Sequence, residues 1–260
     1  MIVAVSDIHL GLDQKYFREQ HFKNFLIYLR DNLFEDGGDL VLLGDIFDFW
    51  RRDLCDVLIQ SEDITEKLLE LNTKNVNIHY VIGNHDYRLR SIAKEVDMPF
   101  KTIGKSLVLF DKSTSTKFMF MHGYQLEVMA NPYIKDLELY EKLAEILCNT
   151  SGFTAHLAFQ IETYIFPQYW NCKKSILTPP KTRLSDKHNI KEKMEILATS
   201  KARPLYLGVD ANDWFVFGHT HYPFLDDNSR TINTGSWIDE TENEYPYLNI
   251  HNGIPELDAF

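Results

Sequence analysis

The chain has 260 residues, of which 44% are hydrophobic and 25% are charged, and its formal net charge is −11. This length allows one large α/β domain or a domain with an insertion, and the composition matches an ordinary globular protein. An acidic surface repels nucleic-acid backbones on average, so the charge disfavours a general nucleic-acid binder.

The cysteines and the apolar segments bear on the compartment. Cys55, Cys148 and Cys172 show no CxxC spacing, so we expect neither a disulfide framework nor a thiolate zinc site. The start of the chain lacks the features of a signal peptide, and no window approaches the roughly 20 apolar residues that span a bilayer. We therefore expect a cytoplasmic protein.

The first half of the chain alternates short β-rich runs with helical stretches, which is typical of βαβ units. Strands are expected at residues 2–5, 40–43, 78–82, 106–110 and 117–121, and helices at residues 16–33 and 64–71. This alternation predicts an α/β fold.

A helical insertion is expected between residue 123 and about residue 204. Strand signal is weak there and apolar residues recur at helical spacing, with a break at Pro179-Pro180. Strand character resumes at residues 214–217, 224–225 and 231–232, and Asn252-Gly253 predicts a tight hairpin turn.

Charge is unevenly distributed along the chain. Residues 171–203 contain nine basic and three acidic side chains, a net charge of +6 in a chain that is acidic overall. This segment is either a solvated helix face or a basic lid that attracts an anionic substrate or lipid headgroups.

Five apolar runs end on residues that can bind a metal ion. The ends read Ser6-Asp7-Ile8-His9, Gly44-Asp45, Gly83-Asn84-His85-Asp86, Met121-His122-Gly123 and Gly218-His219-Thr220-His221. Each motif alone would also fit a helix cap, a turn or a surface loop. The carboxyl ends of the strands in an open α/β sheet border one crevice, however, so together these side chains can converge on one point.

Such a crevice would require cations. Asp7 and Asp45 packed together in low dielectric would repel each other, and two divalent ions would remove that cost. Oxygen and imidazole ligands without thiolate suit manganese, iron, zinc or cobalt, and we expect Mn²⁺ first. The sequence therefore predicts a two-metal hydrolase.

The order of these motifs resembles the signature of the calcineurin-like metallophosphoesterases. In this chain it reads Asp-x-His, Gly-Asp-x-x-Asp, Gly-Asn-His-Asp, His-Gly and Gly-His-Thr-His between residues 7 and 221. The resemblance implies a four-layer αββα sandwich with a metal pair at one edge. It also implies a core of residues 1–123 and 204–260, with residues 124–203 inserted as a helical cap.

The resemblance further implies a ligand set for each ion. The first ion would be held by Asp7, His9, Asp45 and His221, and the second by Asp45, Asn84, His122 and His219. Asp45 would bridge the pair. Asp48 and Asp86 are expected to orient a loop or His85 rather than to bind metal.

A mechanism follows from two such ions. They can hold a bridging hydroxide and clamp phosphoryl oxygens for in-line attack on a phosphoester or pyrophosphate bond. His85 and Asp86 are the expected catalytic pair: His85 would donate a hydrogen bond to the phosphate or a proton to the leaving oxygen, and Asp86 would set its orientation. The alternative for His85 is a purely structural role in its loop.

The substrate is expected to be a small phosphoester or pyrophosphate. Residues 44–50 and the helical insertion are similar to the UDP-2,3-diacylglucosamine pyrophosphatases, in which a helical cap holds acyl chains. The insertion carries the aromatic residues Phe159, Tyr164, Phe166, Tyr169 and Trp170 beside Lys173-Lys174. They would suit a lipid-linked substrate and peripheral membrane contact, or they are plain core.

This chain departs from that subgroup at two positions and leaves other functions open. Many members have Arg where this chain has His85, and Asp where it has Tyr124. A nuclease or cyclic-nucleotide phosphodiesterase would need the basic segment as its nucleic-acid face. A non-catalytic interaction scaffold would be expected to have lost ligands that are all present here. Oligomeric state and the physiological metal stay open.

Overall fold

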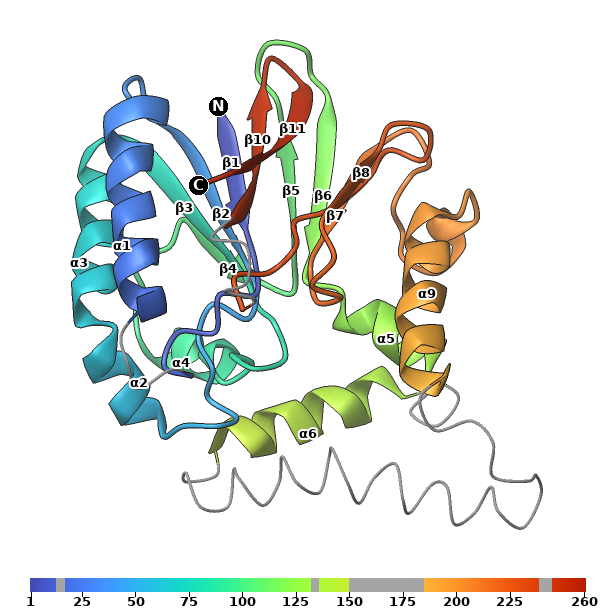
Figure 1. Ribbon diagram of the computed structural model, residues 1–260, viewed down its shortest axis with the longest axis horizontal. Coiled ribbons are helices and arrows are strands. Elements are labelled where there is room, and N and C mark those ends of the chain that lie inside the picture. Colours follow the sequence, from blue (N-terminus) through green and yellow to red (C-terminus); the bar gives the residue numbers. More distant parts are fainter. Residues whose placement is uncertain (13–16, 132–135, 150–184, 239–244) are drawn as a thin grey trace.

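Two facing β-sheets form the centre of the molecule in the computed structural model, which describes residues 1–12, 17–131, 136–149, 185–238 and 245–260 (Figure 1). The six-stranded sheet has the order β11-β10-β1-β2-β3-β4, and the five-stranded sheet has the order β5-β6-β7-β9-β8. Both sheets mix parallel and antiparallel pairs.

The strands of the larger sheet are β1 (Ile2–Val5), β2 (Gly38–Leu43), β3 (Val76–Val81), β4 (Thr102–Gly104), β10 (Pro246–His251) and β11 (Ile254–Ala259). Those of the smaller sheet are β5 (Ser106–Phe110), β6 (Lys117–Met121), β7 (Trp214–Phe217), β8 (Phe224–Asp226) and β9 (Thr231–Asn233). Strands β1 to β4 are parallel neighbours, so the carboxyl ends of β1, β2 and β3 lie at one edge.

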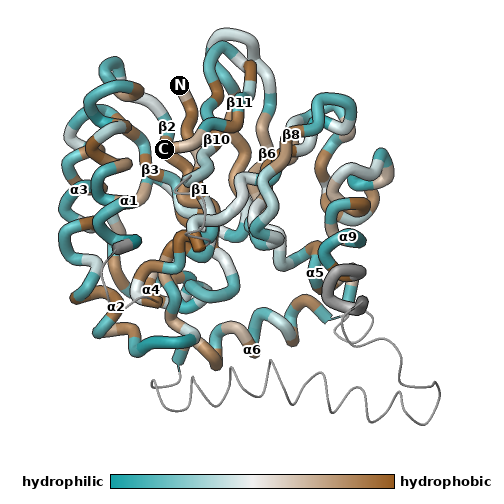
Figure 2. The backbone as a smooth tube through the Cα atoms, viewed as in Figure 1, coloured by the Kyte–Doolittle hydropathy of each residue, from teal (hydrophilic) through white to brown (hydrophobic). Residues whose placement is uncertain are grey.

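The core between the sheets comes from alternate residues of each strand. Ala4 and Val41 of the larger sheet pack against Phe118, Phe120 and Val216 of the smaller one, and all five are fully buried. The neighbouring residues of β1 face the helices on the other side, so the strand is buried on both faces and is continuously apolar. Hydrophobic residues accordingly follow the inner strands in Figure 2.

Helices cover the outer face of each sheet. Helices α1 (Phe17–Tyr28) and α3 (Glu62–Thr73) pack on the larger sheet, with the π-helical segment η1 (Leu29–Leu33) extending α1. Helices α5 (Tyr124–Ala130) and α9 (Ser185–Thr199) pack on the smaller sheet. The predicted α/β class is confirmed, and the structure has two mixed sheets between helices.

Most predicted elements lie where the sequence pattern indicates them. Strands β1, β5, β6 and β7 have the predicted bounds, and the hairpin of β10 and β11 turns at Asn252 and Gly253, both with positive φ. The helices α2 (Leu54–Gln60) and α4 (Leu89–Glu95) and the strand β4 were not predicted. A short η3 turn (Arg203–Leu205) follows α9.

The segment predicted as a cap contains helices with two different placements. Helices α5 and α9 contribute Leu126 and Met194 to the apolar cluster on the smaller sheet, whereas α6 (Leu137–Asn149) runs below the ends of the strands (Figure 1). Pro179-Pro180, the aromatic group at residues 159–170 and Cys172 lie outside the described residues, so the cap and its boundaries stay predictions. In the described part of the chain, no helix has the length and apolarity that a bilayer crossing requires.

Candidate metal centre

The loops that follow β1, β2, β3, β6 and β7 carry the predicted site residues and meet at one edge of the two sheets. Backbone hydrogen bonds join these loops: Asp7 N donates to Gly44 O at 3.1 Å, and His9 N donates to Asp45 O at 2.9 Å. Gly218 N donates to the carbonyl of His122, also at 2.9 Å. A further bond, from His219 N to Asp7 Oδ2 at 2.9 Å, joins the first of these loops to the last, which lie more than 200 residues apart in sequence.

Backbone strain at this edge is concentrated at the predicted ligands. Asp7, His9 and Asp45 each have a φ of 53°, and His219 and His221 have φ values of 65° and 64°. Residues other than glycine rarely adopt this left-handed region, and such strain clusters at functional sites. In both the Asp-x-His and the His-x-His motif, alternate residues are turned so that their side chains reach one centre.

Two glycines allow the loops to approach this closely. A Cβ atom at Gly83 would lie 2.1 Å from Asp45 Oδ1, and one at Gly218 would lie 2.3 Å from Ser6 Oγ. Any side chain at either position would therefore displace a carboxylate or the loop that carries it.

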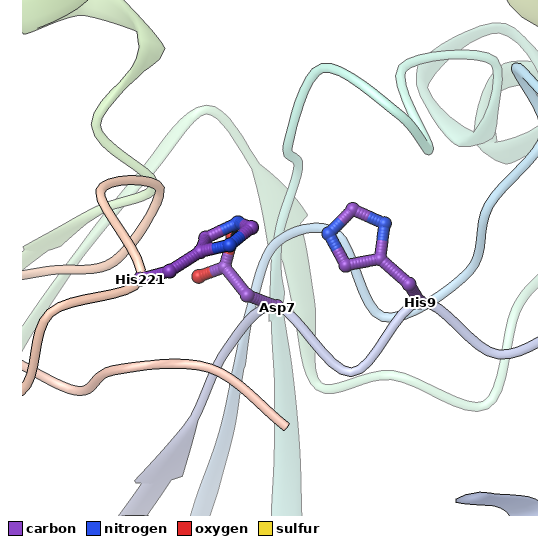
Figure 3. A group of neighbouring side chains, drawn as sticks. All are labelled: Asp7, His9 and His221. Carbon is purple, nitrogen blue, oxygen red and sulfur yellow. Dashed lines mark ion pairs between the residues drawn. The ribbon is translucent and has the colours of Figure 1, made fainter. Parts of the chain in front are cut away.

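The first group of candidate ligands is Asp7, His9 and His221, whose ligand atoms lie within 4.8 Å of one another. His221 Nε2 lies 3.3 Å from Asp7 Oδ1. Figure 3 shows the Asp7 carboxylate beside the His221 ring, with the imidazole of His9 on the other side. Asp7 is fully buried and His9 is nearly so, whereas His221 is partly exposed.

The second group is Asp45, His122 and His219, which satisfies the same distance limit. His122 Nε2 lies 3.2 Å from Asp45 Oδ2 and 3.2 Å from His219 Nδ1. Asp45 Oδ2 also lies 3.9 Å from His9 Nε2, so Asp45 stands between the two groups. His9, Asp45 and His85 make a third, overlapping group.

Three buried polar atoms at this edge indicate whether the site fits divalent cations. Asp7 Oδ1, His9 Nε2 and Asn84 Oδ1 have no hydrogen-bond partner within the described ranges. An unpaired buried polar atom costs about 1–3 kcal/mol, so native structures rarely contain three together. Each of the three is a ligand atom for a divalent cation, and the residues therefore fit a pair of such ions.

The electrostatic interactions at the centre also favour bound cations. Burial tends to raise the pKa of Asp7 and of Asp45, but His122 and the other nearby imidazoles lower both pKa values below the usual range. Burial lowers the pKa of His122, while Asp45 and Asp7 raise it to about 10. In the metal-free protein a proton on His122 thus supplies positive charge that metal ions would otherwise provide.

Hydrogen bonds determine which imidazole nitrogen faces the centre. His122 Nδ1 lies 2.9 Å from the carbonyl oxygen of Leu43, and since a carbonyl only accepts, Nδ1 carries the proton and Nε2 is left as a ligand atom. His9 Nδ1 lies 3.0 Å from Asp48 Oδ2, which leaves His9 Nε2 toward Asp45 in the same way.

His85 is held beside the centre by a ring stack. Its imidazole lies 4.1 Å from the Trp50 ring at an interplanar angle of 25°, and its Nδ1 lies 3.3 Å from Asp48 Oδ1. Burial lowers the pKa of His85, but Asp48 and Asp45 raise it above its ordinary value. An imidazole N–H next to the centre can donate to an anionic substrate.

Asp86 does not orient His85, contrary to our expectation. Its carboxylate accepts hydrogen bonds from Gly83 N at 2.7 Å, Ile46 N at 3.0 Å and the Tyr80 hydroxyl at 2.6 Å. Burial and the charge of Asp45 raise the pKa of Asp86 to about 7. Asp86 therefore links the loop after β2 to the loop after β3 through these hydrogen bonds. Asp48 is the carboxylate beside the His85 ring.

Trp50 and Glu127 contact imidazoles of the site, and the sequence pattern does not point to either of them. Trp50 was seen only as part of a motif, and Glu127 lies on α5 with its Oε2 at 2.8 Å from His219 Nε2. No spacing rule connects either residue to the centre, because both contacts arise from tertiary packing.

Comparison with known proteins agrees with this geometry. The sequence matches the profile of the calcineurin-like phosphoesterases over residues 1–223. The chain belongs to the calcineurin-like phosphoesterase family. Family membership and the buried His/Asp groups together make it a phosphoesterase with a candidate binuclear metal site.

Several distant relatives share one name. The chain is 26% identical to the UDP-2,3-diacylglucosamine hydrolase of Blochmanniella pennsylvanica over 86% of this chain and 80% of the relative. It is 25% identical to the enzyme of that name from Photorhabdus laumondii over 85% and 82% of the two chains. Among solved structures, a dimetal phosphatase from Danio rerio matches with a TM-score of 0.45 and 12% identity over 100% of this chain and 98% of that one.

Proposed function

We infer that this protein is a binuclear metal-dependent hydrolase that cleaves a phosphoester or pyrophosphate bond in a small molecule. One divalent ion would be held by Asp7, His9, Asp45 and His221, and the other by Asp45, Asn84, His122 and His219. Mn²⁺ is the first candidate for both positions.

The observation that carries this inference is the convergence of unpaired ligand atoms. Asp7 Oδ1, His9 Nε2 and Asn84 Oδ1 come from the separate loops after β1 and β3, are buried, and have no hydrogen-bond partner in the described part of the chain. A scaffold without metal would gain stability by pairing or replacing them. Two divalent ions, when bound, would supply an activated nucleophile and neutralise charge on the phosphoryl oxygens.

The chain's own residues would complete the reaction site. His85 is held by Trp50 and Asp48 next to the ligand groups, so it is placed to hold a proton for the leaving oxygen or to donate to the phosphate. Its ring also lies 4.7 Å from that of His9, so a role as a ligand is the competing assignment. We assign His85 to the substrate because Asp7, Asp45 and the remaining imidazoles already provide a ligand set for two ions.

A hydrolysis panel tests the proposal. The purified protein with Mn²⁺ would be given a chromogenic monoester, a chromogenic diester, a nucleotide pyrophosphate and a lipid-linked pyrophosphate, and the products would be identified. Turnover of at least one class that stops on chelation is the expected result. Two bound ions with no turnover of any class would instead favour a non-catalytic scaffold.

A lipid-linked pyrophosphate is the more specific candidate substrate. The proteins named UDP-2,3-diacylglucosamine hydrolase that this chain resembles support it, at 25–26% identity over most of both chains. Lys191 adds a cation near the site, because its Nζ donates to the carbonyl of Thr220 at 2.7 Å. Thr220 stands in the sequence between the candidate ligands His219 and His221. A cation there favours an anionic substrate.

Two features of this chain differ from what the substrate of those relatives would suggest. Tyr124 is fully buried and its hydroxyl donates to Glu141 at 3.1 Å, so it does not supply a carboxylate to the site. Arg203, counted in the basic segment, is buried and bonded to backbone carbonyls such as Ser229 O at 2.8 Å. The lipid-linked arm of the panel, with and without vesicles that contain anionic lipid, therefore decides both the substrate and the membrane contact.

A further inference from the structure

Helix α5 reaches the candidate metal centre through Glu127. Its Oε2 lies 2.8 Å from His219 Nε2. The hydroxyl of Tyr140, on α6, donates to the same oxygen at 2.9 Å. A single carboxylate oxygen thus joins two helices outside the strand-end loops to one of the candidate ligands.

The direction of these hydrogen bonds sets the tautomer of His219. An oxygen that already accepts from a tyrosine hydroxyl accepts again from the imidazole, so His219 Nε2 carries the proton. Nδ1 is then the unprotonated nitrogen, and it is the atom that lies 3.2 Å from His122 Nε2, next to Asp45. His219 would therefore use Nδ1, whereas His122 would use Nε2.

The backbone of His219 is fixed independently of its ring. Its N–H donates to Asp7 Oδ2 at 2.9 Å, and its φ of 65° is in the left-handed region. Asn233 Nδ2 supports the same loop by donating to Thr220 Oγ1 at 2.7 Å and to Gly218 O at 3.2 Å. Loss of Glu127 would thus free the rotation of the ring without moving the loop.

We propose that Glu127 is a positioning residue that holds His219 with Nδ1 toward the second ion, so that α5 controls the affinity of that ion selectively. The proposal rests on the assignment of His219 to the second ion under the proposed function. Carboxylates that accept from a ligating histidine typically change metal affinity by about 10–100-fold when removed. Within the described residues, Glu127 forms no hydrogen bond or ion pair with the first group, Asp7, His9 and His221.

The test measures Mn²⁺ binding by titration calorimetry in wild type, Glu127→Gln, Glu127→Ala and the control Glu141→Gln. Glu141 is a matched control because it also accepts from a tyrosine on a neighbouring helix, Tyr124 at 3.1 Å, but touches no imidazole. We expect wild type and Glu141→Gln to bind two ions. Glu127→Ala should weaken one of the two by about 10–100-fold. Glu127→Gln should fall between wild type and Glu127→Ala, since its amide oxygen still accepts from Nε2.

Two unchanged binding steps in Glu127→Ala would overturn the proposal. A wild type that binds fewer than two ions would instead reject the proposed function, and the two failures are therefore distinct. A readout that needs no variant is the imidazole ¹⁵N spectrum of the wild-type protein loaded with Zn²⁺. It should report His219 with metal on Nδ1 and a proton on Nε2, and the reverse pattern would also overturn the proposal.

Discussion

The two halves of the candidate metal centre are supported by different parts of the fold. Around the first group, Asp7 Oδ2 accepts from Ser6 and from the His219 backbone, and His9 is held by Asp48. All of these residues lie on strand-end loops of the two sheets. Around the second group, Glu127 of α5 holds His219.

Helix α6 supports the second half as well. The Cys148 thiol lies 3.3 Å from the carbonyl oxygen of His85 and 3.7 Å from that of Asn84, behind the loop that carries both residues. The first half is therefore held by strand-end loops of the two sheets, whereas the second half also depends on helices α5 and α6. Variants should separate the two halves by their metal affinity, and Asp45 is the residue that joins them.

Removing the shared carboxylate should have the largest effect. Asp45→Asn is expected to lose both ions and to lower kcat/KM by on the order of 10³ or more, because its Oδ2 lies close to imidazoles of both groups. Metal content by mass spectrometry and turnover on the best panel substrate would measure this. Asp39→Asn, at the opposite end of β2 and 3.0 Å from His79, is the matched control. Full metal content in Asp45→Asn would contradict its bridging position.

His85 should affect turnover but not metal content. His85→Asn is expected to lower kcat by about 10²–10⁴, since it removes a proton donor and leaves the ligand groups in place. Steady-state kinetics at saturating Mn²⁺, together with metal analysis, would test this. His79→Asn serves as a buried histidine control, because His79 is bonded to Thr102 and Asp39 away from the centre. Loss of an ion in His85→Asn would reassign His85 as a ligand.

The charge of His122 makes the metal-free protein sensitive to pH. Burial lowers its pKa but Asp45 and Asp7 raise it, from an ordinary 6.5 to about 10. Because the folded pKa is the higher one, this contribution to stability is complete below pH 6.5 and is lost as pH rises toward 10. The free energy of unfolding should fall by at most about 1.4 kcal/mol per pH unit in that window.

Urea unfolding in chelator at pH 7 and pH 9 would measure this slope, and His122→Asn should flatten it. Mn²⁺ affinity should change in the opposite direction, since an ion bound at Nε2 must displace the proton. Tighter binding at pH 9 than at pH 7 is the expected result. A slope that is the same in wild type and in His122→Asn would contradict the coupling.

The smallest expected effect is on stability, at the contact of helix α6 with the Asn84-His85 loop. Cys148→Ala should lower the free energy of unfolding by about 1–2 kcal/mol, because it leaves a small cavity behind the Asn84-His85 loop. Cys55→Ala is the control, since Cys55 is exposed and its loss should cost under about 0.5 kcal/mol. Equal midpoints of urea unfolding for the two variants would show that α6 does not support this loop.

The sequence predicts the strand ends well for a physical reason. A strand such as β1, buried on both faces, is continuously apolar and then stops at the first polar residue, so the site residues follow the strand directly. Short helices lack such a sharp change from apolar to polar residues, and the sequence did not predict them. Helix α2 begins at the Asp53 cap, whose side chain accepts from Cys55 N at 2.8 Å, and only Val57 in it is buried.

Other features of the centre are not encoded in local pattern. Asp7 and His219 have a positive φ, which Asp and His adopt more often than most non-glycine residues but still rarely, so residue type alone does not predict it and packing of the loops imposes it. The position of Asp48, rather than Asp86, beside the His85 ring depends on where the loop after β3 folds back. The contact of Glu127 with His219 joins residues 92 apart in the chain.

The most direct test of the central claim is a crystal structure grown with Mn²⁺ and measured at a wavelength that gives an anomalous signal from manganese. The account predicts two peaks about 3.5–4 Å apart with the Asp45 carboxylate between them. His122 and His219 should lie at one peak, and His9 and His221 at the other. A single peak, or a pair of peaks that excludes Asp45, would contradict it.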